Sequence, residues 1–158
     1  MKLSAEDERF LEDISSLMAP WGWPRPVGRI YAYLLLRAAP ATLDDIAEDL
    51  GVSKSNASVA ARTLDHCGNA RRHSEPGSKR IYYAVPENHG GPFAAKAELL
   101  GRLERQFDRQ STRALPAGVT HRFEELASFY ARMREAMERV IESDQAEAAP
   151  LGRASGSA

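Results

Sequence analysis

The chain has 158 residues, enough for one domain with helical extensions, and its composition of 43% hydrophobic and 27% charged residues is ordinary for a globular protein. Its sequence shows neither an apolar run of roughly 20 residues nor an apolar leader, so we expect a cytoplasmic protein without a membrane partner. A single cysteine excludes a disulfide framework, and the net charge of −1 argues by itself against a nucleic-acid partner.

The first 40 residues predict two amphipathic helices. Residues 4–19 carry apolar side chains at helical spacing, with Ser4 as the expected N-cap. Residues 21–24 (WGWP) break this helix, and a second one starts near residues 24–26 and ends by Pro40. Prolines suit a first helical turn, because the N–H they lack has no partner there.

Two short helices follow, separated by a tight turn. Thr42 is the expected cap of a helix that ends at Gly51, with Asp45 in the position of a capping box. Ser53 should cap the next helix, residues 54–67. The inner positions of this helix are small or apolar, whereas its outer positions are polar, which leaves one face free; the inner set is Ala57, Ala60, Ala61 and Leu64.

A basic β-hairpin comes next. Residues 70–74 and 79–85 flank Glu75-Pro76-Gly77-Ser78, which suits a type II turn, and the second strand alternates at strand period. Helix, turn, helix and basic hairpin in this order are typical of a winged helix-turn-helix. We therefore predict a mainly α fold with a small β-hairpin wing, in which residues 24–88 form the DNA-binding domain.

The charge distribution supports a DNA-facing surface in this segment. Residues 1–50 carry five basic and nine acidic side chains, whereas residues 51–85 carry six basic and two acidic ones. By itself, a polar helix start or a charged edge strand usually has no function. Here the order, the spacing and the shared positive charge of these features favour duplex DNA as the partner. The predicted DNA-binding residues are Thr42, Ser53, Lys54, Ser55, Asn56, Ser58, Arg62, Arg71, Arg72, Ser78, Lys79 and Arg80.

The remainder of the chain is predicted to be helical. Apolar spacing indicates a helix from Phe93 to about Arg113, a break at residues 115–118, and a long helix through residues 119–141. Residues 146–158 are small and polar and are expected to be a disordered tail. No phosphate loop, nucleophile elbow or metal-ligand spacing is present, so we predict neither an enzyme nor a cofactor or metal site.

Three segments resemble the MarR-type winged-helix regulators, and more closely their GbsR-like branch: RFLEDISSLMAPWGWPRPVGRIYAYLLL, TLDDIAEDLGVSKSNASVAARTL and PGSKRIYYAV. The resemblance implies a homodimeric transcriptional regulator whose terminal helices pair the subunits. Residues 1–23 would then join the dimer interface, and residues 89–145 would supply the C-terminal dimerisation helices. Such a dimer would bind a near-palindromic operator.

Several alternatives remain open at this stage. The chain could be a winged-helix protein-interaction module that has lost DNA binding, since a fold does not fix a function. Trp21, Trp23 and Tyr31 could line a small-molecule effector site, which the resemblance favours slightly, although core packing explains them more simply. Cys67 could be a redox sensor, although an inert thiol at a helix end is the simpler interpretation.

Overall fold

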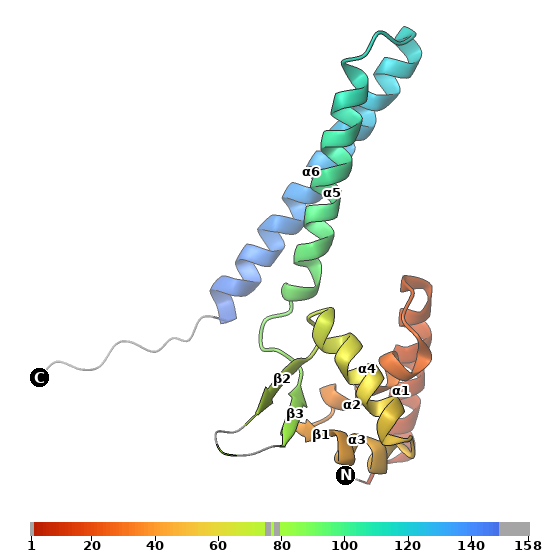
Figure 1. Cartoon of the computed structure of the whole chain (residues 1–158), viewed down its shortest axis with the longest axis vertical. Helices are drawn as coiled ribbons and strands as arrows, with labels where there is room; N and C mark the ends of the chain where they lie inside the picture. The colour runs from red at the N-terminus through yellow and green to blue at the C-terminus, as the bar shows by residue number, and fades with distance from the viewer. Residues whose placement is uncertain (1, 75–76, 78–79, 149–158) are drawn as a thin grey trace, which may run out of the picture. The chain divides into compact units, whose positions relative to one another are not determined.

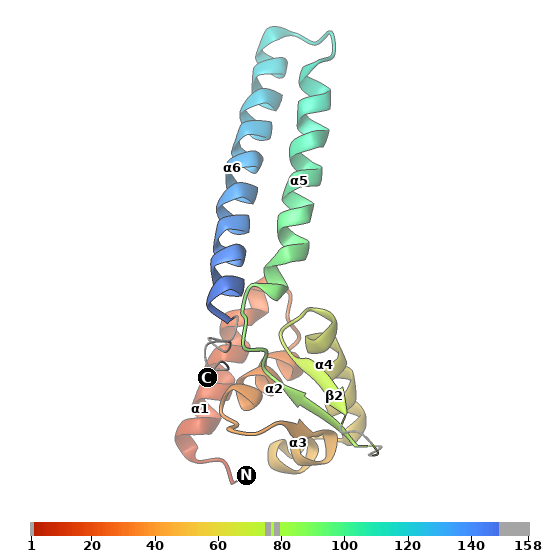
Figure 2. The same cartoon turned by 90° about the vertical axis from the view of Figure 1, so that its left-hand side faces the viewer.

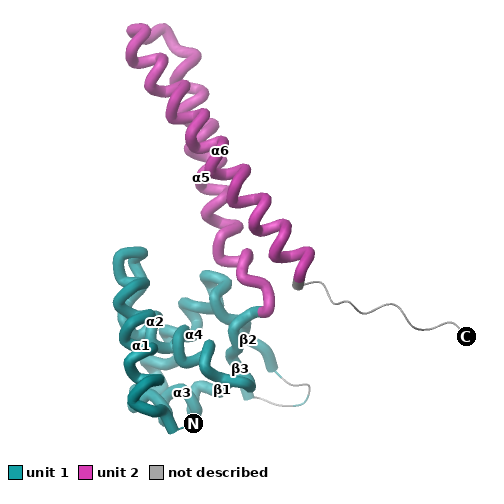
Figure 3. Tube along the Cα trace, turned by 180° about the vertical axis from the view of Figure 1, so that it is seen from behind, with its two compact units in different colours: residues 1–86 teal, residues 87–158 magenta. Residues whose placement is uncertain are grey.

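The computed structural model describes residues 2–74, 77 and 80–148, and it divides into two units, Met1–Pro86 and Glu87–Ala158 (Figure 3). The element order is α1, η1, α2, β1, α3, α4, β2, β3, α5 and α6 (Figure 1). Among the described helices, none is long and apolar enough to cross a membrane. The boundary between the units falls two residues before the end predicted for the DNA-binding segment.

The N-terminal helix α1 (Ala5–Met18) begins where the sequence predicted, because Ser4 and Asp7 form a reciprocal capping box. A 3₁₀ turn, η1 (Ala19–Trp21), and Gly22 with a φ of 83° then reverse the chain into α2 (Arg25–Leu35). The two helices approach very closely, since a Cβ on Gly28 would lie 2.7 Å from the Cα of Ser15. Helix α1 therefore packs within the first unit, against α2.

Helices α3 (Leu43–Leu50) and α4 (Lys54–His66) confirm the predicted helix-turn-helix. Thr42 accepts a bond from the Asp45 amide at 3.1 Å, and Asp45 accepts one from the Thr42 amide at 2.8 Å. Gly51 ends α3 in the left-handed conformation, with a φ of 63°. Ser53 then caps α4 by accepting a bond from the Asn56 amide at 3.2 Å.

The wing is part of a three-stranded antiparallel sheet with the order β1–β3–β2. Strand β2 (Arg71–Ser74) pairs with β3 (Ile81–Ala84), and β3 also pairs with β1 (Ala41–Thr42), a two-residue strand that the sequence did not predict. All four side chains of β2 are exposed at the sheet edge, which explains why its sequence is so polar. The predicted turn rests on residues 75, 76 and 78, which lie outside the described residues.

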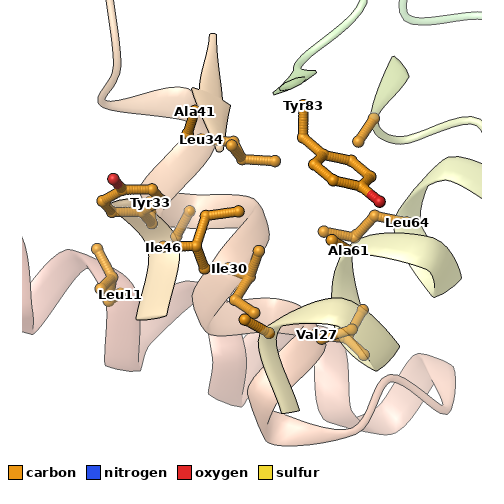
Figure 4. Close-up of a cluster of buried hydrophobic side chains, with 14 residues drawn as sticks. Leu11, Val27, Ile30, Tyr33, Leu34, Ala41, Ile46, Ala61, Leu64 and Tyr83 are labelled. Carbon is orange, nitrogen blue, oxygen red and sulfur yellow. The ribbon is translucent and has the colours of Figure 1, made fainter. Parts of the chain in front are cut away.

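The core of the first unit lies where α2, α3, α4 and β3 meet (Figure 4). Figure 4 shows the Tyr83 ring of β3 next to Ala61 and Leu64 of α4, with Ile30 and Val27 of α2 on the same side of α4. The four predicted inner residues of α4 are all buried. This packing fixes one face of α4 and leaves the opposite face to solvent.

The second unit is a hairpin of two long helices, α5 (Gly91–Ser111) and α6 (Ala117–Ala148), which lie side by side (Figure 2). An ion-pair network joins them, in which Arg134 donates to Glu104 of α5 at 2.9 Å and to Glu138 at 2.7 Å. Gly90, the N-cap of α5, has no side chain to cap the helix, and its amide donates instead to Asp144 of α6 at 2.7 Å.

Two predicted boundaries in this unit were wrong. Ala117 and Gly118 already belong to α6, although we predicted a break through residue 118. The helix starts after Pro116, whose carbonyl accepts bonds from the amides of Val119 and Thr120. Helix α6 also continues to Ala148, three residues into the predicted tail, and residues 149–158 lie outside the described residues.

Candidate nucleic-acid interface

The outward face of α4 carries most of the predicted DNA-binding residues. At 100° per residue, Ser55, Val59 and Arg62 lie opposite the buried row of α4. Ser55, Asn56 and Arg62 are exposed, and Ser58 is half-buried. The Arg62 guanidinium donates from Nε to the Ser58 carbonyl at 3.2 Å, so this side chain runs back along its own helix. Apart from Val59, the outward face of α4 is polar.

The start of α4 combines a capped helix end with a paired lysine. The Ser53 hydroxyl is the cap, because it accepts the bond from the Asn56 amide. The ammonium of Lys54 lies 2.7 Å from the carboxylate of Asp44 in the first turn of α3. Asp44 of α3 therefore partly neutralises the positive charge of Lys54 at the start of α4.

Two arginines of the wing project to opposite sides of it. Arg71 is paired with Ala84 and Arg72 with buried Tyr83, and successive side chains of a strand alternate between the two faces. Beside Arg71, the His73 ring stacks on Tyr82 at a centroid distance of 5.7 Å. The backbone amide of Arg72 donates to Asp65 of α4 at 3.0 Å, which ties the wing to that helix. A single flat surface can therefore meet Arg71 or Arg72, but not both equally.

The turn end of β3 and the start of α4 meet at one hollow. It has a volume of about 580 Å³, and its lining includes Lys54 of α4, Arg80 just before β3, and Asp44 and Asp45 of α3. The bonds from the backbone and hydroxyl of Thr42 hold the pKa of Asp45 below its ordinary value, so this carboxylate is ionised at neutral pH. The structure thus brings Lys54 and Arg80 together, but beside two acids.

Three predicted contact residues have a particular status. Thr42 is half-buried, and its hydroxyl donates to Asp45 at 2.7 Å while accepting from the same residue, so its visible role is to cap α3. Ser78 and Lys79 lie outside the described residues. For these three positions, as for the other predicted DNA-binding residues, contact with DNA stays a prediction.

The predicted effector residues lie in or beside the core of the first unit. Trp23 and Tyr31 pack edge to face, with ring centroids 5.4 Å apart, and both belong to the partly buried shell around the core. Burial raises the pKa of Tyr31. Trp21 is exposed at the end of η1 and does not take part in this pair. The pair has the geometry of ordinary aromatic packing.

Cys67, the predicted redox residue, is a free and exposed thiol at the C-cap of α4. Just after it, Gly68 has a φ of 76° and the amides of Asn69 and Ala70 both donate to the Leu64 carbonyl, so residues 67–70 form an ordered helix end. Among the described residues, no group of three or more His, Cys, Asp or Glu is placed to hold a metal ion.

Comparison with known proteins agrees with this geometry. Residues 28–88, which include most of α2, the helix-turn-helix and the wing, match the family model described as "Sugar-specific transcriptional regulator TrmB". The helix-turn-helix is thus of the transcriptional-regulator type. This assignment agrees with the prediction that the chain is a regulator rather than an enzyme.

Two proteins of Bacillus subtilis (strain 168) are 28% identical to this chain over 87 residues. These residues make up 55% of the chain. They are "HTH-type transcriptional repressor OpcR" and "Putative HTH-type transcriptional regulator YvaV". The matched segment spans about half of each relative, 47% and 49% respectively.

The fold is shared with a solved structure titled "Crystal Structure of a transcriptional regulator". The TM-score is 0.72 at 20% identity, and the match covers 89% of this chain and 99% of the other. The match therefore includes helices of the second unit as well as the winged helix-turn-helix, which confirms the predicted fold class.

Sequence reasoning missed two features of the interface. One is the pairing of Lys54 with Asp44, and the other is Val59, whose side chain is 56% exposed on the outward face of α4. A helical wheel could have found Val59, since it falls opposite the Ala57, Ala60, Ala61 and Leu64 row.

Proposed function

We propose that this chain is a sequence-specific DNA-binding transcriptional regulator that acts as a homodimer on a near-palindromic operator in the cytoplasm. The observation that carries the proposal is the outward face of α4, which is held by a buried opposite face and flanked by a basic wing. A recognition helix needs such a free polar face and an accessible N-terminus to enter the major groove. The similarity to OpcR, which is described as a transcriptional repressor, favours repression.

The chemistry of the exposed residues suits each expected contact. Asn56 can pair with an adenine edge through its amide, and Arg62 can reach a guanine or a phosphate. Lys54 and Arg80 carry charge to the backbone on either side of the same hollow. The motifs of the sequence favour placing the chain in the GbsR-like branch of the MarR-type regulators.

An apolar stripe on α6 supports the homodimer. Phe129, Met133 and Val140 are exposed at 48%, 43% and 68%, and Ala136 lies between the last two. Their spacing of four, three and four residues is the seam of a coiled coil, which buries such side chains against a second helix. A pocket of about 370 Å³ lined by Phe93, Met133, Ala136 and Val140 extends the same apolar surface across to α5. Leu17 and Trp21 are exposed apolar side chains of the first unit.

Binding to DNA selected from a random duplex pool tests the proposal directly. Each phosphate contact contributes about 0.9 to the slope of log affinity against log salt, so Lys54→Ala in a dimer should lower that slope by about 1.8. Arg122→Ala is the matched control, since this exposed arginine lies on α6 and removes the same charge. If no duplex is selected, or if the Lys54→Ala and Arg122→Ala proteins bind alike, the proposal is wrong.

The alternative of a protein-interaction module has one observation in its favour. Asp44 and Asp45 offset Lys54 and Arg80 in the hollow, which lowers the positive potential where DNA would lie. Under this alternative, the cellular phenotype would survive replacement of both Lys54 and Arg62 by Ala. Control by a small molecule or by oxidation of Cys67 stays a prediction, and a ligand-dependent rise in melting temperature would support the first.

A further inference from the structure

Val59 is an aliphatic side chain in the middle of a polar surface. It is 56% exposed, and among the exposed residues of α4, all of which are described, it is the one with an aliphatic side chain. Its position falls between Ser55 and Arg62 on the outward face, opposite the residues that α4 buries. The core of the first unit therefore does not explain why valine stands here.

Neighbouring side chains leave Val59 uncovered. Arg62 is held back by its bond to the Ser58 carbonyl, and the Thr63 hydroxyl donates to the Val59 carbonyl at 3.0 Å. Both bonds run along the helix and use backbone atoms, so the two methyl groups of Val59 remain at the surface. A β-branched side chain in a helix is restricted to one strongly preferred rotamer, so these methyl groups have a fixed position.

The major groove offers one apolar partner to such a side chain. Base edges there present hydrogen-bond donors and acceptors, with the exception of the 5-methyl group of thymine. An aliphatic side chain that enters the groove between polar residues gains free energy only where a thymine methyl is there to meet it.

We infer that Val59 is a specificity-determining residue that reads a thymine 5-methyl group in each half-site of the operator. The inference rests on the proposed function, because it requires α4 to be the recognition helix. It adds a contact that is apolar and therefore insensitive to salt, in contrast to the contacts expected of Lys54 and Arg62.

Replacing single thymines of a selected duplex by deoxyuridine removes the methyl group and keeps the base pairing. With one such thymine replaced in a single half-site, the full-length wild-type protein should bind the deoxyuridine duplex about fourfold more weakly. With the equivalent thymine replaced in both half-sites, binding should be about fifteenfold weaker. The Val59→Ala protein should bind thymine and deoxyuridine duplexes alike. Since Val59 is exposed and alanine favours helix, its melting temperature should not fall.

Two further proteins make the comparison specific. Ser55→Ala changes the same face without touching an aliphatic group, so it should keep the full deoxyuridine penalty, and Val59→Thr should keep part of it. The inference is overturned if wild type binds every deoxyuridine duplex as tightly as the thymine duplex, or if Val59→Ala shows the wild-type penalty. Failure to select any duplex would instead overturn the proposed function, and this inference with it.

Discussion

The ammonium nitrogen of Lys54, in the first turn of α4, lies 2.7 Å from Oδ1 of Asp44, in the first turn of α3. The two side chains are 62% and 74% exposed, so water screens the pair and it contributes little to stability. The pair matters for binding instead, because it places the Asp44 carboxylate beside the Lys54 ammonium, which is proposed to contact a DNA phosphate. Binding to DNA requires Lys54 to exchange this carboxylate for a phosphate oxygen.

Replacing Asp44 by Asn should therefore raise the affinity for DNA. The exposed pair is worth a fraction of 1 kcal/mol, so the gain is about threefold per protomer, measured by fluorescence anisotropy on a selected duplex. Asp13→Asn is the control, since it removes the same charge from an exposed position on α1. Equal affinities for the Asp44→Asn and Asp13→Asn proteins would show that the Lys54–Asp44 pair does not oppose binding.

The close crossing of α1 and α2 predicts that Gly28→Ala destabilises the first unit. Alanine normally favours a helix over glycine, but here the new Cβ would lie 2.7 Å from the Cα of Ser15, a backbone atom that cannot move alone. We expect a loss of about 2 kcal/mol in the free energy of unfolding, as for other overpacked sites. Urea unfolding followed by tryptophan fluorescence measures it, because both tryptophans lie in this unit.

Gly118→Ala provides the contrast for this experiment. A Cβ on Gly118 meets nothing within 4 Å, and the residue lies in α6, so alanine should be neutral or stabilising there. Its effect is read from circular dichroism, since the tryptophans do not report on the second unit. A Gly28→Ala protein as stable as wild type would mean that the two helices separate without cost.

Asp144 should make the end of the α5–α6 hairpin sensitive to acid. Backbone bonds from Gly90 and His89 hold the pKa of Asp144 below its ordinary value of 3.8. Because the pKa of Asp144 is lower in the folded state than in the unfolded state, the ionised carboxylate stabilises the hairpin above pH 3.8. This stabilisation is lost as the pH falls through the lower, folded-state pKa. The amide proton of Gly90 should therefore shift in NMR spectra with a midpoint below 3.8.

In the Asp144→Asn protein the amide oxygen can still accept the Gly90 bond, but the titration should disappear. In the Asp144→Ala protein the acceptor is lost as well, and the Gly90 amide should exchange faster with solvent. A wild-type midpoint at or above 3.8 would show that the Gly90 bond does not favour the charged form.

The fold could be predicted from the sequence wherever local chemistry decides it. Ser4, Thr42 and Ser53 each cap the helix that follows them, because the first amides of a helix need nearby acceptors. The buried row of α4 also follows from the sequence, since small and apolar residues recur there at helical spacing.

What the sequence could not show depends on contacts between distant or very short segments. Strand β1 has only two residues, too few for an alternating pattern, and the Gly90–Asp144 bond joins positions 54 residues apart. Lys54 and Asp44 are both exposed, and which acid a surface lysine meets depends on how α3 and α4 cross. For the candidate site, the residue types were therefore predictable, whereas their partners were not.

The apolar stripe of α6 predicts the position of the dimer interface. A glutamate at Met133 or Val140 would bring an unpaired charge into a coiled-coil seam, where it costs several kcal/mol. Each variant should weaken dimerisation by at least about a hundredfold in sedimentation velocity and weaken operator binding with it. Ser128→Glu is the control, because it adds the same charge about 100° around α6 from Phe129. Variants that remain dimeric would place the subunit interface elsewhere, with the exposed Leu17 and Trp21 of the first unit as the next surface to test.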